Sequence, residues 1–225
     1  MVLSIVAVGE EYINNCLPYL DRFKNSGYDI KILTDNPQRF IGYDTQLYEN
    51  KIFSYFDKLL FSLRLVEKYK TDVLYIDSDW IQNVNDGFIK NFHGSENVLY
   101  YDNWENDLFI NYINDFYWKD LLFYFNLYKI DHFHLKLPLE WIFYFPNIDN
   151  ISQVLFDLEK IKPIFDWIST VVPSQYIGNG NGEGLGLSHV LDLNKIELIK
   201  FNKDLFKDAK ENKKIIWKFN KKHLY

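Results

Sequence analysis

The chain of 225 residues contains very little cysteine and no long hydrophobic run. Cys16 is the only cysteine, which excludes an intrachain disulfide and a cysteine-based zinc site. No run of 18 uncharged apolar residues occurs, so no membrane span is expected. Met1–Gly9 lacks the basic start and long apolar stretch of a signal peptide and instead has the pattern of a strand. These absences predict a cytoplasmic protein, in the host cytoplasm if the chain is viral.

Basic residues are also few, and they are unevenly distributed. The formal net charge is −6, yet residues 195–225 carry 10 lysines against 4 acidic residues. The remainder of the chain is strongly acidic, which makes it a poor general DNA binder. The basic C-terminal segment fits either a solvated terminal helix and strand or an anion site for phosphates. With 48% hydrophobic residues, the chain has enough apolar material for one large core.

Short apolar runs alternate with helical patterns in the first half of the chain. Helical spacing of apolar residues covers Glu10–Ser26 and Phe53–Tyr69. The runs that predict buried strands are Leu3–Val8, Tyr28–Leu33, Val73–Ile76 and Val98–Tyr101. This alternation predicts an α/β fold with a doubly wound, mostly parallel central sheet flanked by helices.

Polar residues follow each of these four strands. They are Gly9-Glu10, Thr34-Asp35, Asp77-Ser78-Asp79 and Asp102-Asn103. Ligands of open parallel sheets bind beyond the carboxyl ends of the strands. We therefore expect these residues to meet at one edge of the sheet and to form the functional site there.

The second half of the chain has a less regular pattern. Trp104–Tyr128 is rich in aromatic residues and could be helical, whereas Leu135–Phe145 has the pattern of an extended segment. Ile151–Val172 predicts a helix that is bent or split at Pro163. Five of the 10 glycines then fall within residues 178–186, which predicts a loop.

Asp77-Ser78-Asp79 is the most informative short motif. Two carboxylates one residue apart at a strand end can approach one hard cation, Mg²⁺ or Mn²⁺, which takes its other oxygens from water and a substrate diphosphate. The alternative is a solvated turn in which one aspartate caps the following helix. The place of Asp77-Ser78-Asp79 directly after a buried strand favours a metal–diphosphate site.

The residues around this motif resemble a known group of enzymes. Val73–Trp80 is similar to the strand and Asp-x-Asp of nucleotide-sugar-dependent glycosyltransferases with the GT-A fold. Phe56–Arg64 resembles the helix that precedes the motif in glycosyltransferase families six and eight. Gly9–Tyr12 and Leu33–Asp35 also fit the nucleotide-binding start of such enzymes, so the resemblance covers residues 2–102.

The resemblance implies a single GT-A-like domain over residues 1–225. Residues 1–103 would form the nucleotide-sugar-binding half, residues 104–194 the acceptor side, and residues 195–225 a basic C-terminal segment. It also implies a retaining transfer from a UDP-sugar, with Mn²⁺ or Mg²⁺ bridging the donor diphosphate.

The resemblance further assigns roles to individual residues. Asp79 would bind the metal. Asp77 would bind the metal and also face the ribose or sugar, and Ser78 would belong to the cofactor-binding site. Lys58 and Arg64 would reach the donor sugar or phosphates. The nucleoside pocket would be lined by Val8, Gly9, Glu10, Tyr12 and Asp35.

Two further carboxylates are candidate catalytic residues alongside Asp77. Glu183 lies within the glycine-rich segment, where it could bind acceptor hydroxyls or stabilise positive charge on the sugar. Family six enzymes carry an acid directly before a Ser-His pair, whereas Leu187 precedes Ser188 here. Glu140, before an aromatic run, is a competing acceptor-site acid.

The C-terminal segment offers candidates for the diphosphate and for the third metal ligand. Lys218 could neutralise the leaving diphosphate, together with the neighbouring lysines. Family eight enzymes use a C-terminal histidine as a metal ligand, which implies this role for His223, and His189 is the alternative.

Three functions are consistent with these patterns. The first is a glycosyltransferase whose acceptor is a glycan or, if the chain is encoded by a phage, a modified DNA base; nucleic acid enters only as that acceptor. The second is a nucleotidyltransferase of related architecture. Such an enzyme would need a glycine-rich loop with Arg and Lys for phosphates, and Val8–Glu11 lacks one, which counts against this function. The third is a non-catalytic protein that binds nucleotides.

Overall fold

The computed structural model describes residues 1–50, 53–101, 126, 135–136, 142–171 and 183–201. Within them lies a seven-stranded sheet of order β3-β2-β1-β4-β6-β5-β7. The strands are β1 Val2–Ala7, β2 Asp29–Thr34, β3 Asp44–Leu47, β4 Val73–Ile76, β5 Val98–Tyr101, β6 Ile142–Phe145 and β7 Leu198–Lys200. The sheet is parallel except for β6, which pairs antiparallel with β4 and β5. The expected α/β fold with a mostly parallel central sheet is confirmed.

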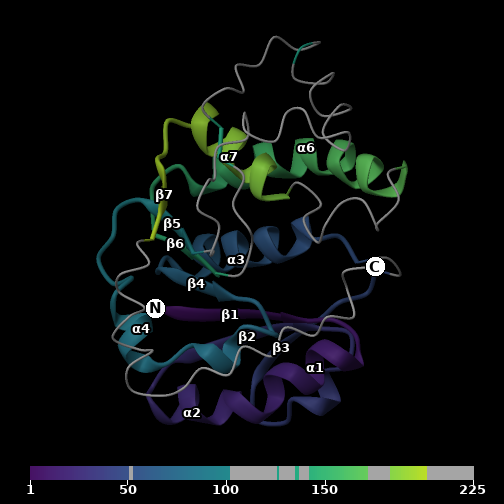
Figure 1. The fold of residues 1–225 in the computed structure, drawn as a ribbon, viewed down its shortest axis with the longest axis vertical. Helices are drawn as coiled ribbons and strands as arrows, with labels where there is room; N and C mark the ends of the chain where they lie inside the picture. Colours follow the sequence, from purple (N-terminus) through teal and green to yellow (C-terminus); the bar gives the residue numbers. More distant parts are fainter. Residues whose placement is uncertain (51–52, 102–125, 127–134, 137–141, 172–182, 202–225) are drawn as a thin grey trace.

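Helices cover both faces of the sheet. They are α1 Glu10–Cys16, α2 Leu20–Asn25, α3 Phe56–Tyr69, α4 Asp86–Lys90, α6 Ile151–Val171 and α7 Glu183–Leu193. Figure 1 shows α3, α6 and α7 on one face and α1, α2 and α4 on the other. The described part contains no helix long and apolar enough to cross a membrane.

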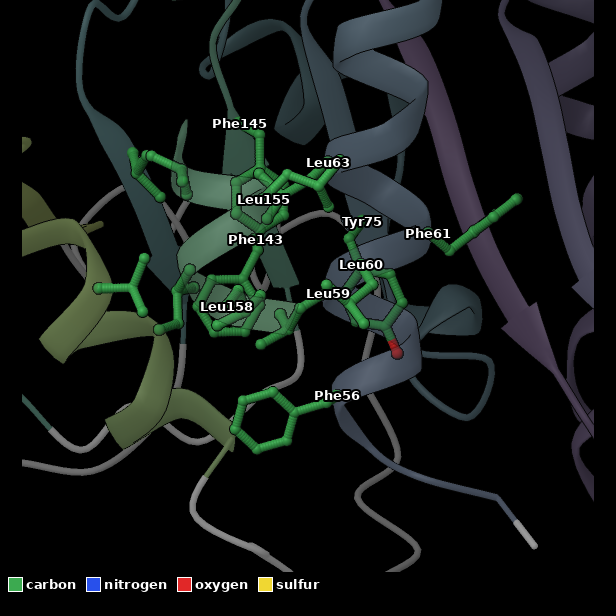
Figure 2. Packing of buried hydrophobic residues seen from close by; sticks show 14 of the residues in the cluster. Phe56, Leu59, Leu60, Phe61, Leu63, Tyr75, Phe143, Phe145, Leu155 and Leu158 are labelled. Atoms are coloured by element: carbon green, nitrogen blue, oxygen red, sulfur yellow. The ribbon is translucent and has the colours of Figure 1, made fainter. Parts of the chain in front are cut away.

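The alternation of side chains along the strands builds two cores. In β1, Val2 and Val6 face α3, whereas Leu3, Ile5 and Ala7 face α1 and α2. The larger core lies under α3, α6 and α7, and Figure 2 shows its aromatic and leucine side chains between these helices and the sheet. Ser4 is the polar exception on this face, and its hydroxyl bonds to that of Ser62 in α3 at 2.8 Å. Burial on both faces explains why these strands are nearly continuous apolar runs.

Parallel pairing places several of the expected strand ends at one edge of the sheet. β1 is parallel to β2 and to β4, so Gly9, Asp35 and Asp77 follow strands that end on the same side. Asp102-Asn103 lies outside the described residues. The helix α3 follows β3 along the chain and leads back to the start of β4, so its first turn lies at this same edge.

Several local expectations need correction. Glu10–Ser26 is two short helices joined by the 3₁₀ turn Leu17–Tyr19, with Pro18 in the turn. Ile151–Val171 is one helix that contains Pro163, not a split one. Within the segment predicted to be extended over 135–145, Ile142–Phe145 forms β6, and residues 137–141 lie outside the described residues. The strands β3 and β7 had not been predicted, because each is short and lies at an edge of the sheet, so neither has a fully apolar run.

Candidate functional site

The site is built where β4 ends against the start of α3. Residues alternate sides along β4, so Tyr75 and then Asp77 project toward the face covered by α3. Lys58 lies in the first turn of α3, on the inner side of the helix. The sequence thereby directs a lysine and an aspartate toward each other at the carboxyl edge of the sheet.

Lys58 is enclosed at this position and is only 4% exposed. Its Nζ lies 3.1 Å from Glu183 Oε1 and 3.9 Å from Asp77 Oδ1. The same nitrogen lies 5.1 Å from the ring centroid of Tyr55 and 5.8 Å from that of Tyr75. Burial alone would lower the pKa of Lys58, but Asp77 and Glu183 outweigh burial and raise it, so the ammonium stays charged.

Asp77 lies between this enclosed cation and solvent. Its side chain is 25% exposed, and the hydroxyl of Tyr75 donates a hydrogen bond to Oδ1, the same oxygen that Lys58 approaches. Burial and the neighbouring Asp79 raise the pKa of Asp77 to about 7, against the opposing effect of Lys58. Asp77 therefore gains or loses its proton near neutral pH.

Asp79 is exposed at the rim, whereas Ser78 between the two aspartates is buried. Tyr12 is 43% exposed, and its pKa is raised by partial burial and by the negative charge of Asp79, so the two groups are close enough to interact electrostatically. Ser78 is thus directed into the protein, and Asp77, Asp79 and Tyr12 form the accessible part of the site.

Glu183 corrects one expectation from the sequence. It is the first residue of helix α7 and is fully buried, not part of an exposed loop. Gly186, one turn later, allows α7 to pack closely on α3: an added Cβ would lie 2.6 Å from Cζ of Phe56 and 3.2 Å from Cδ1 of Ile161. Figure 2 shows the Phe56 ring reaching from the start of α3 toward α7. This close approach of α7 to α3 allows Glu183 to form its ion pair with Lys58.

We expect Gly186→Ala to destabilise the protein by about 1–3 kcal/mol, since the methyl group would displace α7 from the buried Phe56 ring. Denaturant unfolding measures this. Gly87→Ala is the matched control, because Gly87 is an exposed residue of α4 where the added Cβ would lie 3.3 Å from Asn85 Oδ1 alone. A Gly186→Ala protein as stable as the control would show that α7 does not need this close packing.

Gly9 and Asp35 form the other part of the edge. The backbone N–H of Gly9 donates to Asp35 Oδ1 at 3.0 Å, which joins the ends of β1 and β2. Gly9 has a φ of +95°, a conformation that favours glycine. Val8 is half-buried against the larger core. Gly9 and Asp35 are therefore in contact, and their role in a nucleoside pocket stays a prediction.

Two predicted residues are directed elsewhere. Glu10 forms an ion pair with Arg39 at 2.6 Å and is exposed. Arg64 forms an exposed ion pair with Glu159 of α6, also at 2.6 Å. Because Arg64 follows Lys58 by six residues, it lies about 9 Å farther along α3, away from the sheet edge. The structure therefore does not bring Arg64 to the site.

Most of the remaining candidates cannot be placed among the described residues. Glu140, Lys218 and His223 lie outside the described residues. His189 is buried in α7. In the part of the chain that the structure describes, no three His, Cys, Asp or Glu side chains gather as a metal site. The two carboxylates at Asp77 and Asp79 suit Mg²⁺ or Mn²⁺, which usually keep several water ligands.

Sequence reasoning did not identify Tyr55 and Tyr75 as part of the site. Tyr75 could have been found, because it precedes Asp77 by two residues in a strand and so shares its face. Tyr55 precedes α3 and lies near Tyr12, and burial raises its pKa to about 12. Its position depends on where α3 begins, which the helical pattern predicted three residues too early.

Comparisons with known proteins give similar solved structures but no family. No family model matches the sequence, and no curated protein matches it. Among the solved structures that match is 4-diphosphocytidyl-2C-methyl-D-erythritol synthase from Anaerococcus prevotii DSM 20548. It is 8% identical, with 94% of this chain and 95% of that chain covered and a TM-score of 0.43. Similarity at this level does not identify a substrate.

Proposed function

We propose that the protein is a divalent-metal-dependent transferase for a nucleotide-linked substrate and, more narrowly, a glycosyltransferase that uses a nucleotide sugar, with UDP-sugars as the first candidates. One observation carries the proposal: Asp77 and Asp79 directly follow the buried strand β4 at the carboxyl edge of the sheet, where Asp77 lies near the enclosed Lys58. This edge is where open α/β sheets bind ligands.

Asp77 and Asp79 would hold Mg²⁺ or Mn²⁺, which suits their all-oxygen donor set. When bound, the cation supplies positive charge that stabilises a leaving diphosphate. The exposed Asp79 and the part-exposed Asp77 leave room for phosphate oxygens on the solvent side. Lys218 remains the proposed partner of the diphosphate from the C-terminal segment.

Gly9, Asp35 and Tyr12 would bind the nucleoside. The N–H of Gly9 holds one oxygen of Asp35, which fixes the carboxylate at the ends of β1 and β2. Tyr12 offers an exposed aromatic side chain next to Asp79 for contact with a base or ribose. The acceptor would be a glycan or a modified DNA base, with Glu140 as the proposed acceptor-side acid.

A direct test separates glycosyl transfer from nucleotidyl transfer. With UDP-sugars and Mn²⁺, a glycosyltransferase slowly hydrolyses its donor and releases a nucleoside diphosphate. A nucleotidyltransferase instead releases pyrophosphate from a nucleoside triphosphate. We expect the first product, because the turn Val8-Gly9 and the start of α1 at Glu10-Glu11 contain no basic residue for a triphosphate. Release of pyrophosphate would support nucleotidyl transfer. If neither product is released, a non-catalytic binding protein is favoured.

Metal binding should strengthen as the pH rises through 7. A raised pKa of about 7 leaves Asp77 mostly protonated at pH 6 and mostly ionised at pH 8. A cation must displace this proton, so we expect the apparent Mg²⁺ affinity to be about tenfold higher at pH 8. Thermal unfolding with and without Mg²⁺ at both pH values measures this. Asp77→Asn should remove the difference, and equal Mg²⁺ effects at both pH values in the unaltered protein would contradict it.

A further inference from the structure

We infer that Lys58 and Glu183 form a charge-balancing pair that sets the cation affinity of Asp77 and couples helix α7 to the metal site. This inference rests on the proposed metal site. It replaces two roles expected from the sequence, in which Lys58 would bind the donor and Glu183 the acceptor. Both residues are instead positioning residues, which act through Asp77.

Burial separates these two side chains from a substrate. Lys58 is 4% exposed and Glu183 is 0% exposed. Lys58 lies near the rings of Tyr55 and Tyr75, and its Nζ lies 3.1 Å from Glu183 Oε1. A group so enclosed can influence a ligand through its charge and through the position of its neighbours.

The two distances from Lys58 show how the charge is shared. The contact with Glu183 is close, whereas Asp77 Oδ1 lies farther away at 3.9 Å. Glu183 thus offsets the ammonium charge that would otherwise repel a divalent cation from Asp77. Without this carboxylate, less of the Lys58 charge next to the metal site would be offset.

The pairing also connects two distant parts of the chain. Glu183 begins α7, and the close contact between Gly186 and Phe56 seats this helix on the start of α3. A cation at Asp77 would repel the Lys58 ammonium, so it should favour the arrangement in which Glu183 of the docked α7 contacts Lys58 and offsets its charge. By linkage, binding of the cation and docking of α7 then stabilise each other by the same free energy.

The test is titration of Mn²⁺ into the full chain, with free Mn²⁺ followed by electron paramagnetic resonance. Glu183→Gln keeps the shape of the side chain and removes its charge, so we expect about five- to tenfold weaker Mn²⁺ binding. The double variant Lys58→Met/Glu183→Gln removes both charges and should restore the affinity to within about twofold. Glu159→Gln is the matched control, because it removes one carboxylate from the exposed pair with Arg64.

The outcomes are distinguishable from failure of the proposed function. If the unaltered protein and Asp77→Asn bind Mn²⁺ alike, the metal site itself is wrong. If the unaltered protein binds Mn²⁺ at Asp77 but Glu183→Gln binds it equally well, the charge-balancing role is overturned. A purely structural role for Glu183 would also leave the double variant as impaired as the single one.

A measurement on the unaltered protein keeps the inference testable if Glu183→Gln does not fold. Hydrogen exchange of the backbone amides of α7 should slow when Mn²⁺ is added, while exchange in α2, on the opposite face of the sheet, stays unchanged. Unchanged exchange in α7 at saturating Mn²⁺ would contradict the coupling.

Discussion

Asp79→Ala is expected to lower metal-dependent hydrolysis of a nucleotide-sugar donor by at least about 100-fold, because it removes a ligand of the cation that stabilises the leaving diphosphate. Asp79 is exposed, so the variant should fold like the unaltered protein. The measurement is the rate of nucleoside diphosphate release with Mn²⁺ present.

The control for this prediction is Asp149→Ala, which removes an exposed aspartate between β6 and α6. It should retain the full rate. If Asp79→Ala kept the rate of this control at low Mn²⁺ concentration, Asp79 would not be a metal ligand.

Lys58→Met is expected to destabilise the protein by about 3–5 kcal/mol, because it leaves the carboxylates of Glu183 and Asp77 without their shared buried cation. Denaturant unfolding measures this loss. Adding Glu183→Gln should recover a large part of the stability, since the second change also removes the buried carboxylate charge that Lys58 offsets.

Arg64→Met provides the comparison within the same helix. Arg64 is 53% exposed in its pair with Glu159, and loss of such a surface pair costs about 1 kcal/mol or less. Equal losses for Lys58→Met and Arg64→Met would show that Lys58 is not a buried counterion.

The strands β1, β2, β4 and β5 were predictable because they are largely buried on both faces. Uninterrupted runs such as Val73–Ile76 mark such strands, and parallel order then brings Gly9, Asp35 and Asp77 to one edge. The antiparallel β6 was not predictable, because its place between β4 and β5 depends on pairing between distant segments. Nothing in the run Ile142–Phe145 distinguishes a parallel from an antiparallel neighbour.

The site was predicted in part. The two aspartates and Lys58 were identified from a motif and a helix pattern, but the burial of Lys58 was not. Glu183 was placed in a loop because glycines usually interrupt helices. Gly186 instead serves the close packing of α7 on Phe56, a tertiary contact that local sequence does not reveal. That packing changes Glu183 from a candidate acceptor ligand into the partner of Lys58.

The most direct test of a metal-dependent nucleotide site at Asp77 and Asp79 is calorimetric titration of UDP into the unaltered protein, with and without Mn²⁺. We expect Mn²⁺ to strengthen UDP binding at least about tenfold, as a cation shared between carboxylates and a diphosphate should. UDP binding that is equally strong without Mn²⁺ would contradict the metal site. Absence of binding for UDP and every other nucleoside diphosphate, with either metal, would contradict the nucleotide site as a whole.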